Sequence, residues 1–307
     1  MAKHTGYATF LEFGRARIPP RPFFADQELL AGRLAGMSET TWPACADSIA
    51  MFEWLLHVRD GVWFGAPVFD RRRLMSRRKL RLFFCACCRR AGRWLSDVAL
   101  RALLVAEEFA DGRASAETLR KVHRLLWIRR TDRPEINPCI IRALEATCKV
   151  TGSFVGLLDS YPIAGLVEAS TIPFDGTWEG VRAAAAQELA AQAELLRHIY
   201  SNPFRPAWAT TCGVCHGVGA AIVREGAASY VEDPCLVCGG QGFQPGVRPD
   251  LPSAVMQLAE ALYAGADCHF AVHDALLDNG QPELAEHFAA PEHPKGCWLL
   301  DLILEKV

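Results

Sequence analysis

CGVCHGVG (residues 212–219) and CLVCGGQG (residues 235–242) are two copies of the pattern Cys-x-x-Cys-x-Gly-x-Gly. Nineteen residues separate the inner cysteines at positions 215 and 235. Structural Zn²⁺ is held by four donors in a tetrahedron, and each Cys-x-x-Cys turn presents two sulfurs to one point. The pattern therefore predicts one structural zinc site, with the ligands Cys212, Cys215, Cys235 and Cys238.

The segment between the two motifs predicts a β-hairpin. Residues 221–223 and 229–231 are typical of short strands and flank a five-residue loop, 224–228. The glycines of each motif allow tight turns that direct backbone N–H groups at the sulfurs. Because so small a module has almost no core, we expect metal binding to supply most of its folding free energy, about 10–16 kcal/mol in zinc peptides.

Two other interpretations of these four cysteines stay open. They are free thiols in one, and in the other they hold an iron–sulfur cluster, which also uses four cysteines. His216 lies beside Cys215, and we expect it at the surface because four sulfurs already complete the zinc shell. A closed shell of four protein ligands is typical of a structural zinc and not of a catalytic one.

The doubled motif resembles half of the cysteine-rich domain of DnaJ-type co-chaperones, which carries four such repeats and two zinc ions. The resemblance covers about thirty residues of the chain, 212–242. The chain has no His-Pro-Asp sequence of the kind found in a J-domain. The resemblance therefore implies one zinc ion and a small protein-binding module.

Length and composition predict a globular intracellular protein. The chain has 307 residues, of which 50% are hydrophobic, enough for one large domain or two ordinary ones. Eight of its twelve cysteines lie outside the zinc motifs, several of them in apolar stretches such as 83–88, which favours reduced thiols and a cytoplasmic location. No apolar run approaches the roughly 18 residues of a membrane span, so we expect no membrane association.

The fold class that we predict is mainly α, a multi-helix array with an inserted small zinc-binding β-hairpin. Prolines at 19, 20 and 22 predict an extended or disordered arm over residues 1–25. Proline and glycine on both sides of the cysteine motifs divide the rest into a helical body (26–206), a zinc β-hairpin insertion (207–249) and C-terminal helices that pack on the body (250–307).

Helices are predicted from apolar residues at helical spacing and from capping residues at their ends. Ser38, Asp47, Ser96 and Ser115 are expected N-caps, and residue 177 precedes a long alanine-rich helix. The expected helical segments are 38–42, 47–56, 80–91, 98–109, 119–128, 139–150, 181–200, 255–262, 270–277, 282–288 and 298–304. The tryptophans at 42, 54, 94, 127 and 298 fall on helical stripes, so we expect them in the core.

The helical body resembles a paralogous family of uncharacterised bacterial helical proteins. The resemblance rests on five short stretches, and it implies no activity because the family has none assigned. In that family the Asn-Pro-Phe-Arg-Pro stretch leads directly into the next helix, so the hairpin is expected to be an insertion. The five stretches are WPACAD (42–47), KLRLF (79–83), CCRR (87–90), NPFRP (202–206) and GCWLLD (296–301).

The strongest charge feature is the segment 71–93, which contains ten Lys or Arg residues and no acid. It suggests a phosphate-binding face for nucleic acid. The alternative is a solvated face whose arginines pair with acids such as Glu107, Glu108 and Asp111, as a net charge of −2 favours. The candidate nucleic-acid ligands are Arg71, Arg72, Arg73, Arg77, Arg78, Lys79, Arg81 and Arg89.

Other candidate sites have simpler explanations. His269 and His273 are four residues apart on a helix and could share a metal, but no third ligand is indicated. Cysteines 85, 87 and 88 are expected to be buried apolar residues. No catalytic triad, phosphate loop or open metal site is recognised. We therefore expect a non-enzymatic scaffold that binds another protein, with a nucleic-acid-binding protein as the alternative.

Overall fold

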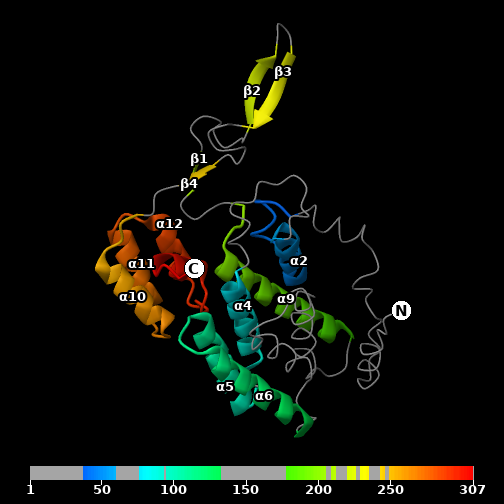
Figure 1. The fold of residues 1–307 in the computed structure, drawn as a ribbon. Coiled ribbons are helices and arrows are strands. Elements are labelled where there is room, and N and C mark those ends of the chain that lie inside the picture. Colours follow the sequence, from blue (N-terminus) through cyan, green and yellow to red (C-terminus); the bar gives the residue numbers. More distant parts are fainter. Residues whose placement is uncertain are drawn as a thin grey trace.

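The computed structural model describes residues 37–59, 76–92, 95–132, 178–204, 209–211, 220–225, 229–234, 243–245 and 249–306. Within these ranges the chain is mainly helical, which confirms the predicted mainly α class (Figure 1). The predicted arm (1–25) and the predicted helix 139–150 lie outside the described residues.

Among the residues described, five helices precede the strands. They begin where the sequence supplies a side-chain acceptor for the first free backbone N–H groups. Asp47 Oδ1 accepts from the N–H of both Ile49 and Ala50 at 3.1 Å, and Ser96 Oγ accepts from Ala99 N–H at 3.3 Å. The helices are α2 (Ser48–Arg59), α4 (Arg77–Arg90), α5 (Asp97–Ala110), α6 (Ala116–Asp132) and α9 (Trp178–Tyr200).

The segment after Ser38 is a turn and not the helix that the sequence predicts. Ser38 Oγ accepts the N–H of Thr41 at 3.2 Å, but residues 39–44 form turns. Pro43 explains the difference because it has no N–H to donate to a helical hydrogen bond and disfavours helical backbone at the residue before it. The indole of Trp42 instead donates to the carbonyl of Ser201, 2.9 Å away.

The first hydrophobic core forms around α4. Phe52 of α2 stacks on Phe83 of α4 with ring centroids 5.7 Å apart, and Trp54 lies 4.7 Å from Phe204. These side chains and Trp42 are at most 8% exposed, so the prediction that Trp42 and Trp54 belong to the core is confirmed. The core therefore joins α2, α4 and the end of α9, with α5 and α6 packed on the other side of α4 (Figure 1).

Residues 249–306, which we call the C-terminal unit, have a core of their own. Val255, Val272, Phe288 and Leu300 are fully buried in it. Figure 1 shows the unit beside α4 and α5, with its last helix nearest to them. Its elements are α10 (Ser253–Tyr263), α11 (His269–Asp278), α12 (Pro282–Ala285), the 3₁₀ helix η3 (Glu286–Ala289) and α13 (Trp298–Ile303).

Arg78 of α4 is the main polar link between the two cores. Its guanidinium donates to both carboxylate oxygens of Asp301 in α13 and to Asp111 after α5, at 3.1 Å. Tyr263 of α10 completes the cluster by donating its hydroxyl to Asp111 at 2.6 Å. The Arg78 side chain is 11% exposed and the two carboxylates at most 3%, so this is a buried charge network.

Four short strands lie between α9 and the C-terminal unit. β1 (Ala209–Thr211) pairs antiparallel with β4 (Phe243–Pro245), and β2 (Ala220–Glu225) pairs antiparallel with β3 (Ser229–Pro234). In Figure 1 the β2–β3 pair extends away from the helices, with the β1–β4 pair between. The four predicted zinc ligands and His216 lie outside the described residues.

No helix among the described residues is long and apolar enough to cross a membrane.

Candidate metal centre

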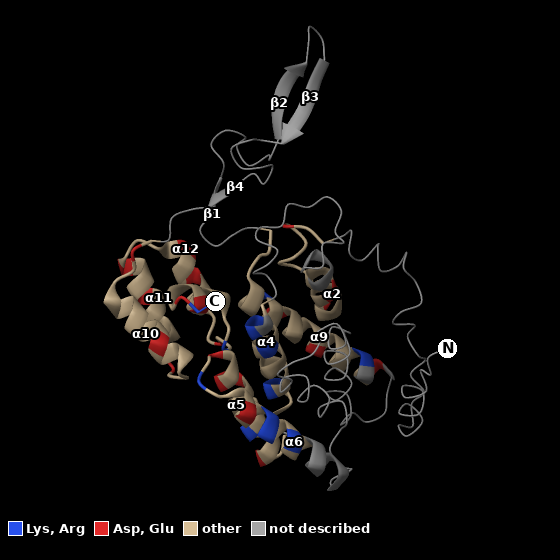
Figure 2. Cartoon of the chain, in the orientation of Figure 1, with Lys and Arg blue, Asp and Glu red and all other residues tan. Residues whose placement is uncertain are grey.

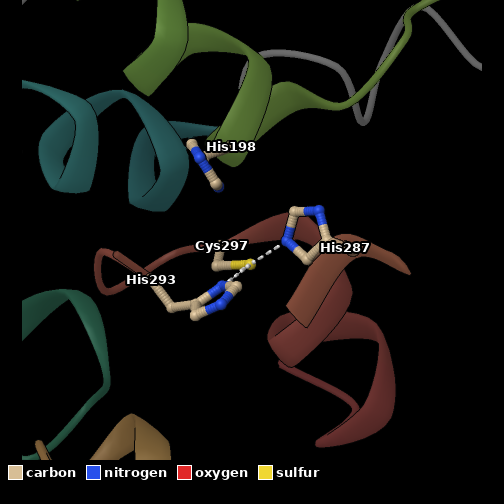
Figure 3. Close-up of side chains that lie close together, drawn as sticks. All are labelled: His198, His287, His293 and Cys297. Atoms are coloured by element: carbon tan, nitrogen blue, oxygen red, sulfur yellow. Dashed lines mark hydrogen bonds between the residues drawn. The ribbon is translucent and has the colours of Figure 1, made fainter. Parts of the chain in front are cut away.

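Three histidines and one cysteine meet where α9 faces the C-terminal unit. We call them the His/Cys centre: His198 in the last turns of α9, His287 in η3, and His293 and Cys297 in the loop before α13. One donor atom from each side chain lies within 4.8 Å of all the others. Figure 3 shows the three rings pointing at the Cys297 sulfur from different elements.

The donor distances fit a tetrahedral ion. His287 Nε2 lies 3.0 Å from Cys297 Sγ, and His293 Nδ1 lies 3.9 Å from the same sulfur (Figure 3). Zinc bonds of 2.0–2.3 Å place neighbouring donors of a tetrahedron about 3.3–3.8 Å apart. Shifts of about 1 Å would therefore bring all four donors to bonding distance.

The ring of His293 is oriented by its second nitrogen. Nε2 lies 2.8 Å from the carbonyl of Ala290, so it carries the proton and donates, and Nδ1 faces Cys297 with a free lone pair. A hydrogen bond from the far nitrogen to a carbonyl is the usual support of a metal-bound histidine. His293 also packs on Phe288, with ring centroids 4.9 Å apart, which restricts the ring further.

The Cys297 sulfur is held at the start of α13 and is completely buried. Burial raises the pKa of this thiol to about 12, although hydrogen bonds from the backbone N–H groups of Leu299 and Leu300 act in the opposite direction. Those N–H groups would stabilise a metal-bound thiolate. Without an ion the sulfur keeps its proton at neutral pH, so metal binding would release it.

His198 supplies the donor from the other side of the centre. Its Nδ1 is buried and has no hydrogen-bond partner among the described residues. Its ring centroid lies 5.3 Å from that of His287 and 5.9 Å from that of His293. Leaving a buried polar atom unpaired costs roughly 1–3 kcal/mol, so such an atom calls for an explanation, such as an ion or a water molecule.

Burial keeps the three imidazoles neutral. It lowers the pKa of His287 to about 3 and of His293 to about 4, with smaller contributions from the neighbouring histidines. Burial also lowers the pKa of His198. A metal ion binds the neutral form of imidazole, so these histidines do not need to lose a proton at neutral pH before they bind one.

The histidine pKa values predict how the stability of the metal-free protein depends on pH. The unfolded histidines have pKa values near 6.5, so between pH 6.5 and about 4 the unfolded chain binds more protons than the folded one. The free energy of unfolding should therefore fall as pH falls through this window. Urea unfolding at several pH values in the presence of chelator measures this dependence. If neither His287→Gln nor His293→Gln changed the slope of the free energy of unfolding against pH, these histidines would not be its cause.

Gly296 lets the chain pass close to α4 just before Cys297. Its φ is +87°, and a Cβ at this position would lie 2.9 Å from Leu82 Cδ1 and 3.0 Å from Leu82 Cβ. Both features exclude a side chain, because positive φ is unfavourable for L-residues and the contact distances are too short. The glycine therefore fixes the distance between the cysteine loop and α4.

Gly296→Ala should lower the free energy of unfolding by about 2–4 kcal/mol, the sum of backbone strain and the clash with Leu82. Gly112→Ala is a matched control, because φ is +74° there but nothing lies within 4 Å of the added carbon. Gly112→Ala should lower the free energy of unfolding by about 1–2 kcal/mol. Urea unfolding of both variants measures the difference, and equal losses would show that the Leu82 contact contributes nothing.

The candidate pair His269 and His273, for which ordinary histidines were the preferred interpretation, is not part of a metal-binding group among the described residues. His269 Nδ1 lies 3.1 Å from Asp267 Oδ1, and His273 Nδ1 lies 3.0 Å from Asp274 Oδ1. Neither residue belongs to the His/Cys centre, although the His269 ring lies 6.4 Å from that of His293. The preferred interpretation, two ordinary histidines, agrees with these contacts.

The basic side chains of this segment that the structure describes make contacts within the fold. Arg78 binds Asp301 and Asp111, and Arg89 makes two hydrogen bonds to Glu107, at 2.6 and 2.9 Å. Glu107 and Asp111 are two of the acids with which the sequence suggested that these arginines could pair. In Figure 2 the ribbon of α4 carries blue, basic positions and lies beside ribbons that carry red, acidic positions.

Two more basic residues of this segment face the interior. The Lys79 ammonium group donates to the carbonyl of Ile199 at 3.1 Å, and Arg81, which is 5% exposed, lies 4.6 Å over the ring of Phe109. Arg78, Arg81 and Arg89 therefore do not form one exposed face. The nucleic-acid prediction now depends on Arg71, Arg72 and Arg73 and on the side chain of Arg77, all outside the described parts of the chain.

Sequence reasoning did not identify the His/Cys centre. One signal was available, since three donors fall within eleven residues in the order His287-x5-His293-x3-Cys297. Clusters of His and Cys at short spacing are typical of metal sites. The fourth donor, His198, is 89 residues before His287 and has no spacing signal.

No protein-family model, curated protein or solved structure matches the chain.

Proposed function

We propose that this protein is a helical scaffold that binds one Zn²⁺ ion in the His/Cys centre. The observation that carries the proposal is the meeting of four donor atoms, from elements far apart in the sequence, within 4.8 Å of one another. A supporting feature is the hydrogen bond from His293 Nε2 to the carbonyl of Ala290, which turns the Nδ1 donor toward Cys297.

The donor set favours zinc. Three imidazoles and one thiolate match the nitrogen and sulfur preference of Zn²⁺ and its tetrahedral geometry. Calcium and magnesium require oxygen donors, and no carboxylate belongs to the group. Copper binds such sites more tightly in principle, but cells control which metals are available.

The same donor set favours a structural ion. Four protein ligands complete a tetrahedron, whereas catalytic zinc sites usually have three and leave the fourth position to water or substrate. The buried sulfur and the packed rings of Phe288 and Trp298 around His293 and His287 also limit access. The proposed role of the ion is therefore to hold α9, η3 and the α13 loop together.

Cobalt substitution tests this proposal. After chelator treatment, Co²⁺ added to the full-length protein should give the visible absorption of a tetrahedral ion and the near-ultraviolet absorption of a thiolate ligand. His293→Gln/Cys297→Ser, which lacks two of the four ligands, should abolish both signals from this centre, and His273→Gln, an exchange of a histidine outside it, should leave them intact. Measurement in the Cys212→Ser/Cys235→Ser background removes any signal from the other predicted site. A six-coordinate cobalt spectrum in that background would refute the proposal.

A second zinc site in the hairpin is also proposed, because the strand pairing favours it. The rung Thr211↔Phe243 lies on one side of both cysteine motifs, and the rung Ala220↔Pro234 lies on the other. The two motifs, 212–219 and 235–242, therefore each connect the β1–β4 pair to the β2–β3 pair. Each does so with eight residues, and the chain runs in opposite directions in the two. This arrangement supports convergence of Cys212, Cys215, Cys235 and Cys238 on one ion.

With both ions bound, the protein would present the hairpin to a protein partner from a rigid helical support. The proposal rests on the position of the β2–β3 pair, which extends beyond the β1–β4 pair and away from the helices (Figure 1). An exposed hairpin offers free strand edges, to which an extended peptide can add. This role would be excluded if the partner bound the Cys212→Ser/Cys235→Ser variant as tightly as it binds wild type.

A further inference from the structure

We infer that metal binding at the His/Cys centre controls whether the C-terminal unit stays docked on α9 and α4, so that the protein responds to transition-metal supply. The inference rests on the proposed function and adds a regulatory role to it. It is based on the observation that the two parts of the chain contribute different numbers of ligands. His287, His293 and Cys297 belong to the C-terminal unit, and His198 alone belongs to α9.

The two parts joined by the ion are complete without each other. The first core contains residues from α2, α4, α5, α6 and α9, and the second contains only residues 255–303. No described side chain belongs to both cores. Parts of a chain that have separate cores commonly move relative to one another unless the interface between them is large and hydrophobic.

Several contacts between the parts are polar. They include the hydrogen bonds of Arg78 to Asp301 and to Tyr263, and the ion pair of Lys295 with Glu107 at 3.4 Å. The attraction within buried ion pairs is largely offset by the cost of removing the charges from water. We therefore expect docked and undocked states to be close in free energy when no ion is bound, with the undocked state modestly favoured.

His198 makes the equilibrium between the docked and undocked states depend on metal. In the docked state without an ion, its Nδ1 is buried without a partner among the described residues, which favours undocking. With an ion, docking adds a fourth ligand to the three of the C-terminal unit. A ligand shifts such an equilibrium by its difference in affinity for the two states. A difference of about 100-fold would change the docked to undocked ratio from about 1:9 to about 9:1.

Hydrogen exchange of the full-length protein with and without Zn²⁺ tests this inference. In wild type, Zn²⁺ should slow exchange about tenfold in the last turn of α9 and around Leu82 of α4, the surfaces that docking covers. In His198→Ala the three remaining ligands should still bind Zn²⁺, about 100-fold more weakly. At saturating metal this variant should show no slowing in α9 and α4.

His198→Asn serves as a second variant if the alanine exchange prevents folding, and His293→Gln/Cys297→Ser, which lacks two ligands, should lose both binding and the exchange effect. The inference is overturned if wild type binds Zn²⁺ with unchanged exchange in α9 and α4, or if metal-saturated His198→Ala shows the wild-type slowing. A direct Zn²⁺ titration of the same samples separates these results from failure of the proposed function, in which wild type would bind no ion at this centre.

Discussion

Replacing Cys297 with Ser should lower the Zn²⁺ affinity of the His/Cys centre by about 100-fold or more. Structural zinc sites bind with about 10–16 kcal/mol in total, so one of four ligands accounts for about 3–4 kcal/mol. The loss is expected to be large because the thiolate is the single anionic donor and carries two supporting N–H groups, those of Leu299 and Leu300. Competition with a chromophoric chelator measures the affinity.

Cys268→Ser is the matched control for this exchange. Cys268 belongs to the same unit, and its sulfur donates to the carbonyl of Leu258, a contact that a serine hydroxyl can replace. The control should bind Zn²⁺ as wild type does. Equal affinities of Cys297→Ser and Cys268→Ser would show that the Cys297 sulfur is not a ligand.

Replacing Arg78 with Met should destabilise the docked protein by about 3–5 kcal/mol, because the carboxylate of Asp301 would stay buried without its cation and that of Asp111 would keep only the half-exposed Arg113. The methionine keeps most of the apolar volume of the side chain, so the loss reports mainly on charge. The free energy of unfolding from urea titration, at a fixed metal concentration, measures the effect.

Arg113 provides the matched control for Arg78. It also pairs with Asp111, at 3.1 Å, but its side chain is 50% exposed. Arg113→Met should therefore cost less than about 1 kcal/mol. The double variant Arg78→Met/Asp301→Asn should recover part of the lost stability, since it removes one of the unpaired charges. Equal losses for Arg78→Met and Arg113→Met would contradict the view that burial makes Arg78 essential.

The helices could be predicted because their signals are local. Asp47, Ser96 and Ser115 each accept the N–H of a residue two or three positions later, so capping needs no knowledge of the rest of the chain. Periodic apolar residues likewise predicted α4, whose Phe83 and Cys87 are fully buried. Ser38 failed as a helix signal because Pro43 limited the segment to a turn.

The candidate metal centre could not be predicted in full because its geometry is created by packing. His198 and Cys297 come together only when the C-terminal unit docks on α9, and no rule of spacing relates them. The role of Arg78 has the same origin, since its partner Asp301 is 223 residues away. The sequence favoured the Cys-x-x-Cys motifs because both halves of that site are local.

The structure also explains the stretch 296–301, which the sequence singled out without a reason. Gly296 allows close approach to Leu82, Cys297 faces the histidines, and Asp301 binds Arg78. Three residues within six positions thus connect the C-terminal unit to the helical body. The same contacts make this stretch the place where substitutions should affect stability and metal binding together.

The zinc content of the purified full-length protein, measured by elemental analysis, tests the central claim most directly. We expect two Zn²⁺ ions per chain in wild type, one in His293→Gln/Cys297→Ser, and one in Cys212→Ser/Cys235→Ser. Unchanged zinc content in His293→Gln/Cys297→Ser would contradict the claim that His198, His287, His293 and Cys297 bind a metal ion.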